Sequence, residues 1–187
     1  MTHVNQTAPA LYADNCAACH GSEAGGGPGF PSLTDDAWLW GGDTDTIMET
    51  LRVGINAPHP ESRIAQMLAF GDMGVLTRPQ IRTVVDYVQS LSGIETEASP
   101  EELAEGEAIF ADNCSSCHGE SATGNRDLGA PDLTDDAWIY GSGNEVMFTT
   151  INQGRQGWMP AWEDRLTVAE RKMLTLYIHD LGEAASK

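Results

Sequence analysis

Two segments with helical hydrophobic periodicity dominate the pattern of the chain. In the first, apolar residues recur at intervals of three and four, and in the second the same spacing returns about 90 positions later. Each segment is preceded by a capping-box pair, Thr77 with Gln80 and Thr167 with Glu170, which marks a helix start. Both segments therefore predict amphipathic helices with core-facing stripes, at Ile81, Val84, Val85, Val88 and Leu91, and at Leu174, Tyr177, Ile178 and Leu181.

A third helix is predicted before Cys114. Ser99 is placed to cap it, Pro100 to occupy its first position and Glu102 to complete a capping box. The corresponding helix before Cys16 is predicted to start at about Pro9 and to be short.

Short helices are expected at 44–51 and 144–151, within Gly- and Pro-rich loops. No stretch alternates with the period of two that a strand requires. The predicted fold class is therefore all-α, with long loops.

The chain repeats itself. ADNCAACHG at 13–21 returns as ADNCSSCHG at 111–119, and LTDDAW occurs at 33–38 and at 133–138. The two closing segments also align, Leu76 with Leu166 and Tyr87 with Tyr177. A polar, acidic stretch at about 93–99 has no periodicity and is predicted to be a linker. The repeat therefore predicts two homologous domains, 1–94 and 95–187.

Composition narrows the classes of function. The 187 residues are 41% apolar and 20% charged, as in soluble globular proteins, and no apolar run is long enough to cross a bilayer. The first ten residues, MTHVNQTAPA, lack the basic start and apolar centre of a signal peptide. A net charge of -18 excludes nucleic acid as the expected partner. The acidic surface fits either a basic protein partner or simple solvation.

All four cysteines lie in two C-x-x-C-H units, the attachment signature of c-type haem. Two thiols at this spacing can form thioethers with one porphyrin, while the adjacent imidazole becomes the proximal iron ligand. A zinc site would need a fourth ligand in each module, and a thioredoxin-like pair would need a preceding strand and no histidine. The predicted attachment residues are Cys16, Cys19, Cys114 and Cys117, and the predicted proximal ligands are His20 and His118.

Two methionines are predicted as sixth ligands. Met67 and Met159 both begin a Met-x-Ala-aromatic stretch shortly before a closing helix, which favours Met67 over Met48, Met73 and His59. Met67 is expected to serve the haem of Cys16, Cys19 and His20, and Met159 that of Cys114, Cys117 and His118.

Further residues are expected around the haems. Arg155 is predicted to pair with a haem propionate, and Arg63 is a second candidate. Four tryptophans are expected to wall the haem crevices: Trp38, Trp138, Trp158 and Trp162.

The tandem C-x-x-C-H modules, LTDDAW after each, AQMLAFG, VLTRPQIRTVVDYVQSLSG and GRQGWMPAW closely resemble the dihaem cytochrome c subunit of cbb3-type cytochrome c oxidases. The resemblance covers nearly the whole chain. It implies two class I cytochrome c domains, with opening and closing helices that cross at a small residue, here near Gly106 and Phe110. Family members carry N-terminal membrane-spanning helices, so this sequence is expected to be the soluble periplasmic portion without the anchor.

The resemblance implies electron transfer from a donor cytochrome, through two covalent haems, to the oxygen-reducing membrane subunits on the periplasmic side of the bacterial inner membrane. On this interpretation the chain is not catalytic by itself. A free dihaem shuttle is the nearest alternative. A dihaem peroxidase and a haem gas sensor are further alternatives, and each would need an open iron.

Overall fold

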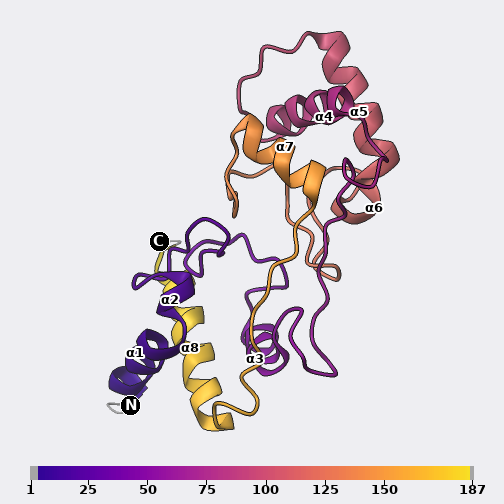
Figure 1. Cartoon of the computed structure of the whole chain (residues 1–187). Coiled ribbons are helices and arrows are strands. Elements are labelled where there is room, and N and C mark those ends of the chain that lie inside the picture. Colours follow the sequence, from indigo (N-terminus) through magenta and orange to yellow (C-terminus); the bar gives the residue numbers. More distant parts are fainter. Residues whose placement is uncertain (1–3, 186–187) are drawn as a thin grey trace. The chain divides into compact units, whose positions relative to one another are not determined.

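The computed structural model describes residues 4–185. Its regular elements are helices, and long loops connect them (Figure 1). Its described residues form isolated β-bridges but no strand, so the expected all-α class with long loops is confirmed. The helices are α1 (Val4–Asn15), α2 (Ala17–His20), α3 (Thr44–Val53), α4 (Arg78–Leu91), α5 (Pro100–Asn113), α6 (Ser115–His118), α7 (Asn144–Gln153) and α8 (Val168–Ala185).

The predicted helix starts are confirmed where a capping box marks them. The backbone N–H groups of Thr77 and Thr167 donate to the side chains of Gln80 and Glu170, at 3.0 and 2.8 Å. Ser99 and Glu102 exchange the same pair of bonds at the start of α5. The prediction for α1 was wrong, because this helix begins at Val4 and continues through Pro9.

The chain divides into two compact units that do not follow the sequence repeat. Unit 1 consists of Met1–Ile64 and Gly157–Lys187, and unit 2 of Ala65–Gln156. The expected boundary between residues 94 and 95 coincides with no boundary between the units. The stretch at about 93–99, predicted to link two domains, instead lies between α4 and α5 inside unit 2. The two repeats have exchanged their closing helices: α8 belongs to unit 1 and α4 to unit 2.

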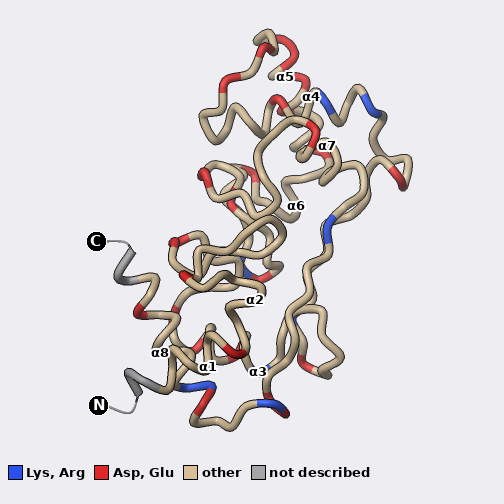
Figure 2. Tube along the Cα trace, turned by 60° about the vertical axis from the view of Figure 1, so that its left-hand side comes forward, with Lys and Arg blue, Asp and Glu red and all other residues tan. Residues whose placement is uncertain are grey.

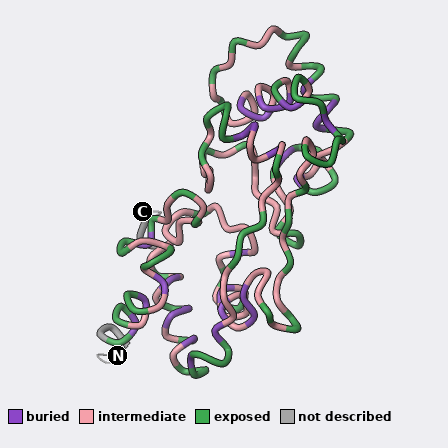
Figure 3. Tube along the Cα trace, viewed as in Figure 1, coloured by how far each residue is buried: buried purple, intermediate pink, exposed green. Residues whose placement is uncertain are grey.

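In unit 1, α8 packs on α1 and α3. The rings of Tyr12 on α1 and Tyr177 on α8 lie 5.7 Å apart. Leu174 and Ile178 of α8 are buried in the core formed with Ile47 and Leu51 of α3. Buried positions recur along the helices, whereas most loop positions are intermediate or exposed (Figure 3). The apolar stripe predicted for the second closing helix, α8, therefore packs against the first opening helix, α1, and completes the core of unit 1.

In unit 2, α4 packs on α5 and α7. A Cβ added to Gly106 of α5 would lie 2.6 Å from the Cβ of Tyr87 and 2.7 Å from the carbonyl oxygen of Thr83, both on α4. The close helix crossing expected at Gly106 and Phe110 is therefore present, but its partner is α4 and not α8. Both closing helices carry the same apolar period, so the pattern alone does not select the partner.

Acidic residues occur along the chain in both units and outnumber the basic residues, 28 to 10 (Figure 2). Among the residues described, no helix has the length and apolar character needed to span a membrane.

Candidate haem sites

Each C-x-x-C-H unit occupies one tight turn at the end of a long helix. The amide of Cys16 donates to Tyr12 as the last bond of α1, and the amide of His20 donates to Cys16 in the next turn, at 2.8 and 2.9 Å. Gly21 then ends the turn at φ +81°, a conformation that favours glycine. The second unit repeats this geometry from Cys114 to Gly119. Two thiols and an imidazole are therefore presented within a single turn.

A backbone carbonyl orients each histidine. Nδ1 of His20 lies 2.9 Å from the carbonyl oxygen of Pro31, and Nδ1 of His118 lies 3.0 Å from that of Pro131. Because a carbonyl only accepts, Nδ1 carries the proton and Nε2 keeps a lone pair for a metal. Burial lowers the pKa of both imidazoles, which favours the neutral form that ligates iron.

The prolines are held in place by sharply turned loops. A Cβ on Gly26 would lie 2.6 Å from the carbonyl oxygen of Phe30, and a Cβ on Gly124 would lie 2.7 Å from that of Ala130. Only glycine permits this close backbone approach, which brings the next carbonyl to the histidine ring.

The helix-end thiol of each unit is less accessible than the second one. Burial, with a smaller contribution from the second cysteine of each unit, raises the pKa of Cys16 and of Cys114 to about 11. Cys16 is buried and Cys114 is partly buried, whereas Cys19 and Cys117 are exposed. Each turn thus presents two thiols, the residues that a covalent haem needs.

The structure groups each predicted methionine with the C-x-x-C-H unit of the other repeat. Met159 packs against the core that contains Cys16, and Met67 packs against the core beside Cys114. The prediction had paired Met67 with the first unit and Met159 with the second. The difference from the prediction has the same origin as that for the helices: each repeat was expected to fold on itself, whereas the chain crosses between units before Met67 and again before Met159.

Short antiparallel bridges fix the two methionine segments. In unit 1, Met159 and Ile55 exchange both backbone hydrogen bonds at 2.9 Å. In unit 2, Met67 and Arg155 exchange them at 2.8 and 3.1 Å. Each methionine segment therefore lies beside the residue that follows α3 or α7.

Two glycines allow these bridges to form. A Cβ on Gly54, at φ +68°, would lie 2.5 Å from the carbonyl oxygen of Met159. A Cβ on Gly154, at φ +72°, would lie 2.4 Å from that of Met67. The sequence signal for this contact was the alignment of Gly54 with Gly154, but only the structure shows what each approaches.

Arg155 and Arg63 occupy matching positions. Nε of Arg155 donates to Thr150 at 3.0 Å, and the guanidinium lies 4.3 Å from the ring centroid of Tyr140. Nε of Arg63 donates to Thr50 at 3.0 Å, and its guanidinium lies 4.9 Å from the ring centroid of Trp40. A guanidinium has further N–H donors beyond Nε, so each arginine can also bind a carboxylate.

Two buried indole nitrogens are further candidates for binding the propionates of a haem. Nε1 of Trp40 in unit 1 and Nε1 of Trp138 in unit 2 are buried without a hydrogen-bond partner among the described residues. Such donors are costly unless an acceptor reaches them, and haem propionates are acceptors of the right kind. Trp40 was missed from the sequence, because it aligns with Tyr140 and not with a second tryptophan.

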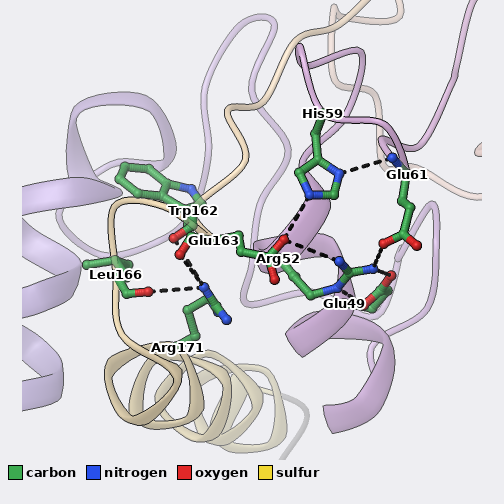
Figure 4. A network of polar contacts seen from close by, with 8 residues as sticks. All are labelled: Glu49, Arg52, His59, Glu61, Trp162, Glu163, Leu166 and Arg171. Atoms are coloured by element: carbon green, nitrogen blue, oxygen red, sulfur yellow. Dashed lines mark hydrogen bonds and ion pairs between the residues drawn. The ribbon is translucent and has the colours of Figure 1, made fainter.

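The rival sixth ligands have other surroundings. Both ring nitrogens of His59 are engaged: Nε2 lies 2.9 Å from Glu163 Oε2, and Nδ1 accepts from the amide of Glu61 at 3.1 Å (Figure 4). Met73 is 60% exposed. The sulfur of Met48 accepts from the hydroxyl of Thr175 on α8.

The four predicted tryptophans are not equivalent. Trp162 is buried in the core of unit 1, and Trp38 and Trp138 pack against the two cores. Trp158, next to Met159, is 61% exposed.

Comparison with known proteins agrees with this geometry. Residues 6–92 match the family model described as cytochrome c, and residues 101–178 match that of cytochrome c oxidase, cbb3-type, subunit III. Each of the two matched ranges contains one C-x-x-C-H unit. The chain therefore contains two domains of the c-type cytochrome class, and such domains imply covalently bound haem c.

Individual relatives carry the relationship across nearly the whole chain. The chain is 50% identical over 172 residues, 92% of its length, to the cbb3-type cytochrome c oxidase subunit FixP of Bradyrhizobium sp.. It is 44% identical over 183 residues, 97% of its length, to subunit CcoP of Cereibacter sphaeroides. These matches cover 59% and 62% of the two relatives, so the chain spans about three fifths of their length. Over nearly its whole length the chain is therefore similar to cbb3-type subunit III cytochromes, as its motifs predicted.

Proposed function

We propose that the chain relays electrons through two covalent haems as part of a cbb3-type cytochrome c oxidase. The observation that carries this proposal is the doubled site: two C-x-x-C-H turns, each with an oriented imidazole and, in the same compact unit, a methionine segment bridged to Ile55 or to Arg155. Bound there, haem c supplies a one-electron iron couple whose potential a His/Met ligand pair raises.

The ligand sets we propose are crossed between the repeats. Cys16 and Cys19 would hold one haem, and His20 and Met159 would ligate its iron. Cys114 and Cys117 would hold the other, and His118 and Met67 would ligate its iron. Support comes from the packing of Met159 against the Cys16 core and of Met67 beside Cys114, each within one compact unit.

The surrounding residues have defined tasks in this proposal. The carbonyls of Pro31 and Pro131 hold the proton on Nδ1 of each histidine, which keeps Nε2 available. Arg63 and Trp40 in unit 1, and Arg155 and Trp138 in unit 2, supply donors for propionates. The apolar cores exclude water and so reduce the reorganisation that a change of charge requires.

The partners follow from the relatives. FixP and CcoP are named as subunits of a cbb3-type oxidase, and we propose that this chain likewise delivers electrons to the oxygen-reducing membrane subunits. The donor is then a cytochrome on the periplasmic side of the inner membrane. A free dihaem shuttle would use the same two sites without the oxidase.

Carbon monoxide binding to the reduced holoprotein tests the electron-transfer function. Two haems per chain and no prompt change of the absorption spectrum are expected, because a methionine occupies the sixth position of each iron. A prompt change in the unmodified protein would contradict the proposal and favour a peroxidase or a gas sensor.

The crossed pairing is tested with single variants of the two methionines. In M159L, the haem that binds carbon monoxide promptly should be the one on the peptide with Cys16 and Cys19. In M67L it should be the haem on the peptide with Cys114 and Cys117. The same substitutions in proteins that carry a single haem, because both cysteines of the other C-x-x-C-H unit are replaced by alanine, identify the open site.

A further inference from the structure

The closing helices differ at one core position. Arg171 on α8 aligns with Ile81 on α4, because Leu166 aligns with Leu76 five residues earlier. Both side chains are buried: Ile81 is 0% exposed in the core of unit 2, and Arg171 is 4% exposed in unit 1. Unit 1 thus contains a permanent positive charge where unit 2 contains an aliphatic side chain.

Arg171 binds the backbone that follows Met159. Its Nη1 donates to the carbonyl oxygens of Glu163 and Leu166 at 2.8 and 3.0 Å, and lies 3.4 Å from that of Trp162 (Figure 4). None of the ion pairs found among the described residues involves Arg171. The Nε of Arg171 is also buried, and it has no hydrogen-bond partner among the residues that the structure describes. Among the described residues, the hydrogen-bond acceptors of this buried guanidinium that lie outside its own helix are the carbonyls of the segment 162–166.

This segment is short and directly connected to the proposed ligand. Only Pro160 and Ala161 separate Met159 from Trp162, whose amide donates to the carbonyl of Leu51 at 2.9 Å. The amide of Leu166 in turn donates to Trp162 at 2.9 Å, so the segment is one closed turn. A guanidinium that holds three carbonyls of this turn restricts how far Met159 can move.

A second arginine holds the outer side of the same segment. Arg52 on α3 contacts the carboxylate of Glu163 at 3.3 Å, and His59 contacts the same oxygen at 2.9 Å. Unit 2 has a different arrangement, because Gly71 stands four residues after Met67 where Glu163 stands four after Met159. There, Asn152 donates to Asp72 at 2.9 Å instead.

We propose that Arg171 is a positioning residue for the sixth ligand of unit 1. By holding the carbonyls of residues 162–166, it keeps Met159 in place against the haem of Cys16 and Cys19. Among the described residues of unit 2, Ile81 stands in place of this arginine, and the Met67 segment is held by the backbone bridge, the Asn152–Asp72 hydrogen bond and apolar packing. This inference rests on the proposed assignment of Met159 as an iron ligand.

The test is the rate of carbon monoxide binding to the reduced, two-haem protein in the variants R171M and R171K. Carbon monoxide replaces the methionine, so the rate reports how often Met159 leaves the iron. R171M should bind about tenfold faster at half of the haem, as expected when charge-assisted hydrogen bonds are lost. R171K, which keeps one charged donor, should show a smaller increase. The near-infrared sulfur-to-iron band of the oxidised protein should weaken in the same order.

Two controls separate positioning from a general loss of stability. K172M removes a charge from the adjacent, exposed position of α8 and should leave both rates unchanged. In an M159L background, where half of the haem already binds promptly, R171M should add nothing to the rate of that half. If R171M fails to retain its haem, the comparison of R171K with K172M decides the matter.

The outcomes distinguish this inference from the proposed function. If M159L opens one haem but R171M and R171K bind carbon monoxide at the unmodified rate, Arg171 is not a positioning residue while the ligand assignment stands. If M159L opens no haem, the ligand assignment itself fails. If R171M accelerates binding equally at both haems, its effect is a general loss of stability and the inference is wrong.

Discussion

Units 1 and 2 share the same C-x-x-C-H turn and methionine segment, but different side chains hold the methionine segment in place. Both present a C-x-x-C-H turn, a carbonyl on the histidine Nδ1 and a methionine segment bridged to the residue after a short helix. Unit 1 surrounds its methionine segment with charged groups, from Arg171 inside and Arg52 outside. Unit 2 uses Ile81 and a neutral amide at the corresponding places. The comparison suggests that the repeat preserves the haem-holding elements while the methionine segments have diverged.

The exchange of closing helices should have the largest consequence. A chain that ends at Leu166 lacks α8 and with it Leu174 and Ile178, which are 0% and 3% exposed in unit 1. Each buried side chain of this size contributes about 2–5 kcal/mol, so unit 1 should not fold. Unit 2 keeps α4 and should remain intact.

Limited proteolysis followed by mass spectrometry of the haem peptides measures this effect. The protected fragment should carry Cys114 and Cys117, because unit 2 contains them. Protection of the fragment with Cys16 and Cys19 would mean that each repeat folds with its own closing helix, and the exchange would be refuted.

The glycines beside the methionine segments should give the next largest effect. G54A would place a Cβ 2.5 Å from the carbonyl oxygen of Met159, and G154A would place one 2.4 Å from that of Met67. Neither carbonyl can move away without moving the methionine itself. We expect each to lower the free energy of unfolding by about 3 kcal/mol or more, and to weaken the sulfur-to-iron band of one haem.

G74A is the matched control for these substitutions. Gly74 has nearly the same φ, +71°, but nothing within 4 Å of an added Cβ. It should therefore cost only the strain of the left-handed conformation, about 1 kcal/mol. Equal losses in thermal unfolding for all three variants would show that the close approach to the methionine segments does not matter.

Smaller effects are expected from the two arginines that stack on Trp40 and Tyr140. R63Q should lower the midpoint potential of the haem in unit 1, and R155Q that of the haem in unit 2, because each removes a positive charge that favours the reduced iron. A change of about 20–60 mV corresponds to no more than a tenfold shift in a one-electron equilibrium. A redox titration resolves the two steps, and R126Q, an arginine of the loop after α6, serves as a control that should move neither. If both variants shifted the same step, the assignment of one arginine to each unit would be wrong.

The smallest expected difference between the two units is in how much stability each loses at acidic pH. In unit 1, hydrogen bonds or ion pairs lower the pKa of several carboxyl groups: Thr46 acts on Asp43, Arg52 on Glu49, His59 on Glu163 and Thr167 on Glu170. In unit 2, Ser99 lowers the pKa of Glu102, whereas burial raises that of Asp86.

The sign of the pH effect follows from these directions. A lowered carboxyl pKa stabilises the fold above the unfolded value and loses that stabilisation as the pH falls through the folded value. A raised pKa, as at Asp86, acts in the opposite direction. Between about pH 5 and pH 3, unit 1 should therefore lose more stability than unit 2. Carbon monoxide binding against pH should rise first at the haem of Cys16, and a first rise at the haem of Cys114 would contradict this ordering.

Much of the architecture could be read from local patterns. Capping boxes at Thr77, Ser99 and Thr167 located three helices, because a cap depends on neighbours only three residues away. The C-x-x-C-H turns and their histidines were equally local. The start of α1 was missed, because a proline was taken as the first helical residue and lies inside the helix instead.

The pairing of elements could not be predicted in the same way. The closing helices share one apolar period, so α4 and α8 are interchangeable as far as the pattern of the sequence is concerned. Their difference lies in single residues such as Ile81 and Arg171, whose meaning depends on the segment that each one meets. The helix exchange and the exchange of methionine segments have the same origin. Met159 and α8 lie in one stretch of chain that belongs to unit 1, and Met67 and α4 lie in one stretch that belongs to unit 2.

A crystal structure of the holoprotein, with the two irons located by their anomalous scattering, tests the crossed ligation most directly. The account predicts the sulfur of Met159 opposite His20 and the sulfur of Met67 opposite His118. Met67 opposite His20, with Met159 opposite His118, would contradict it.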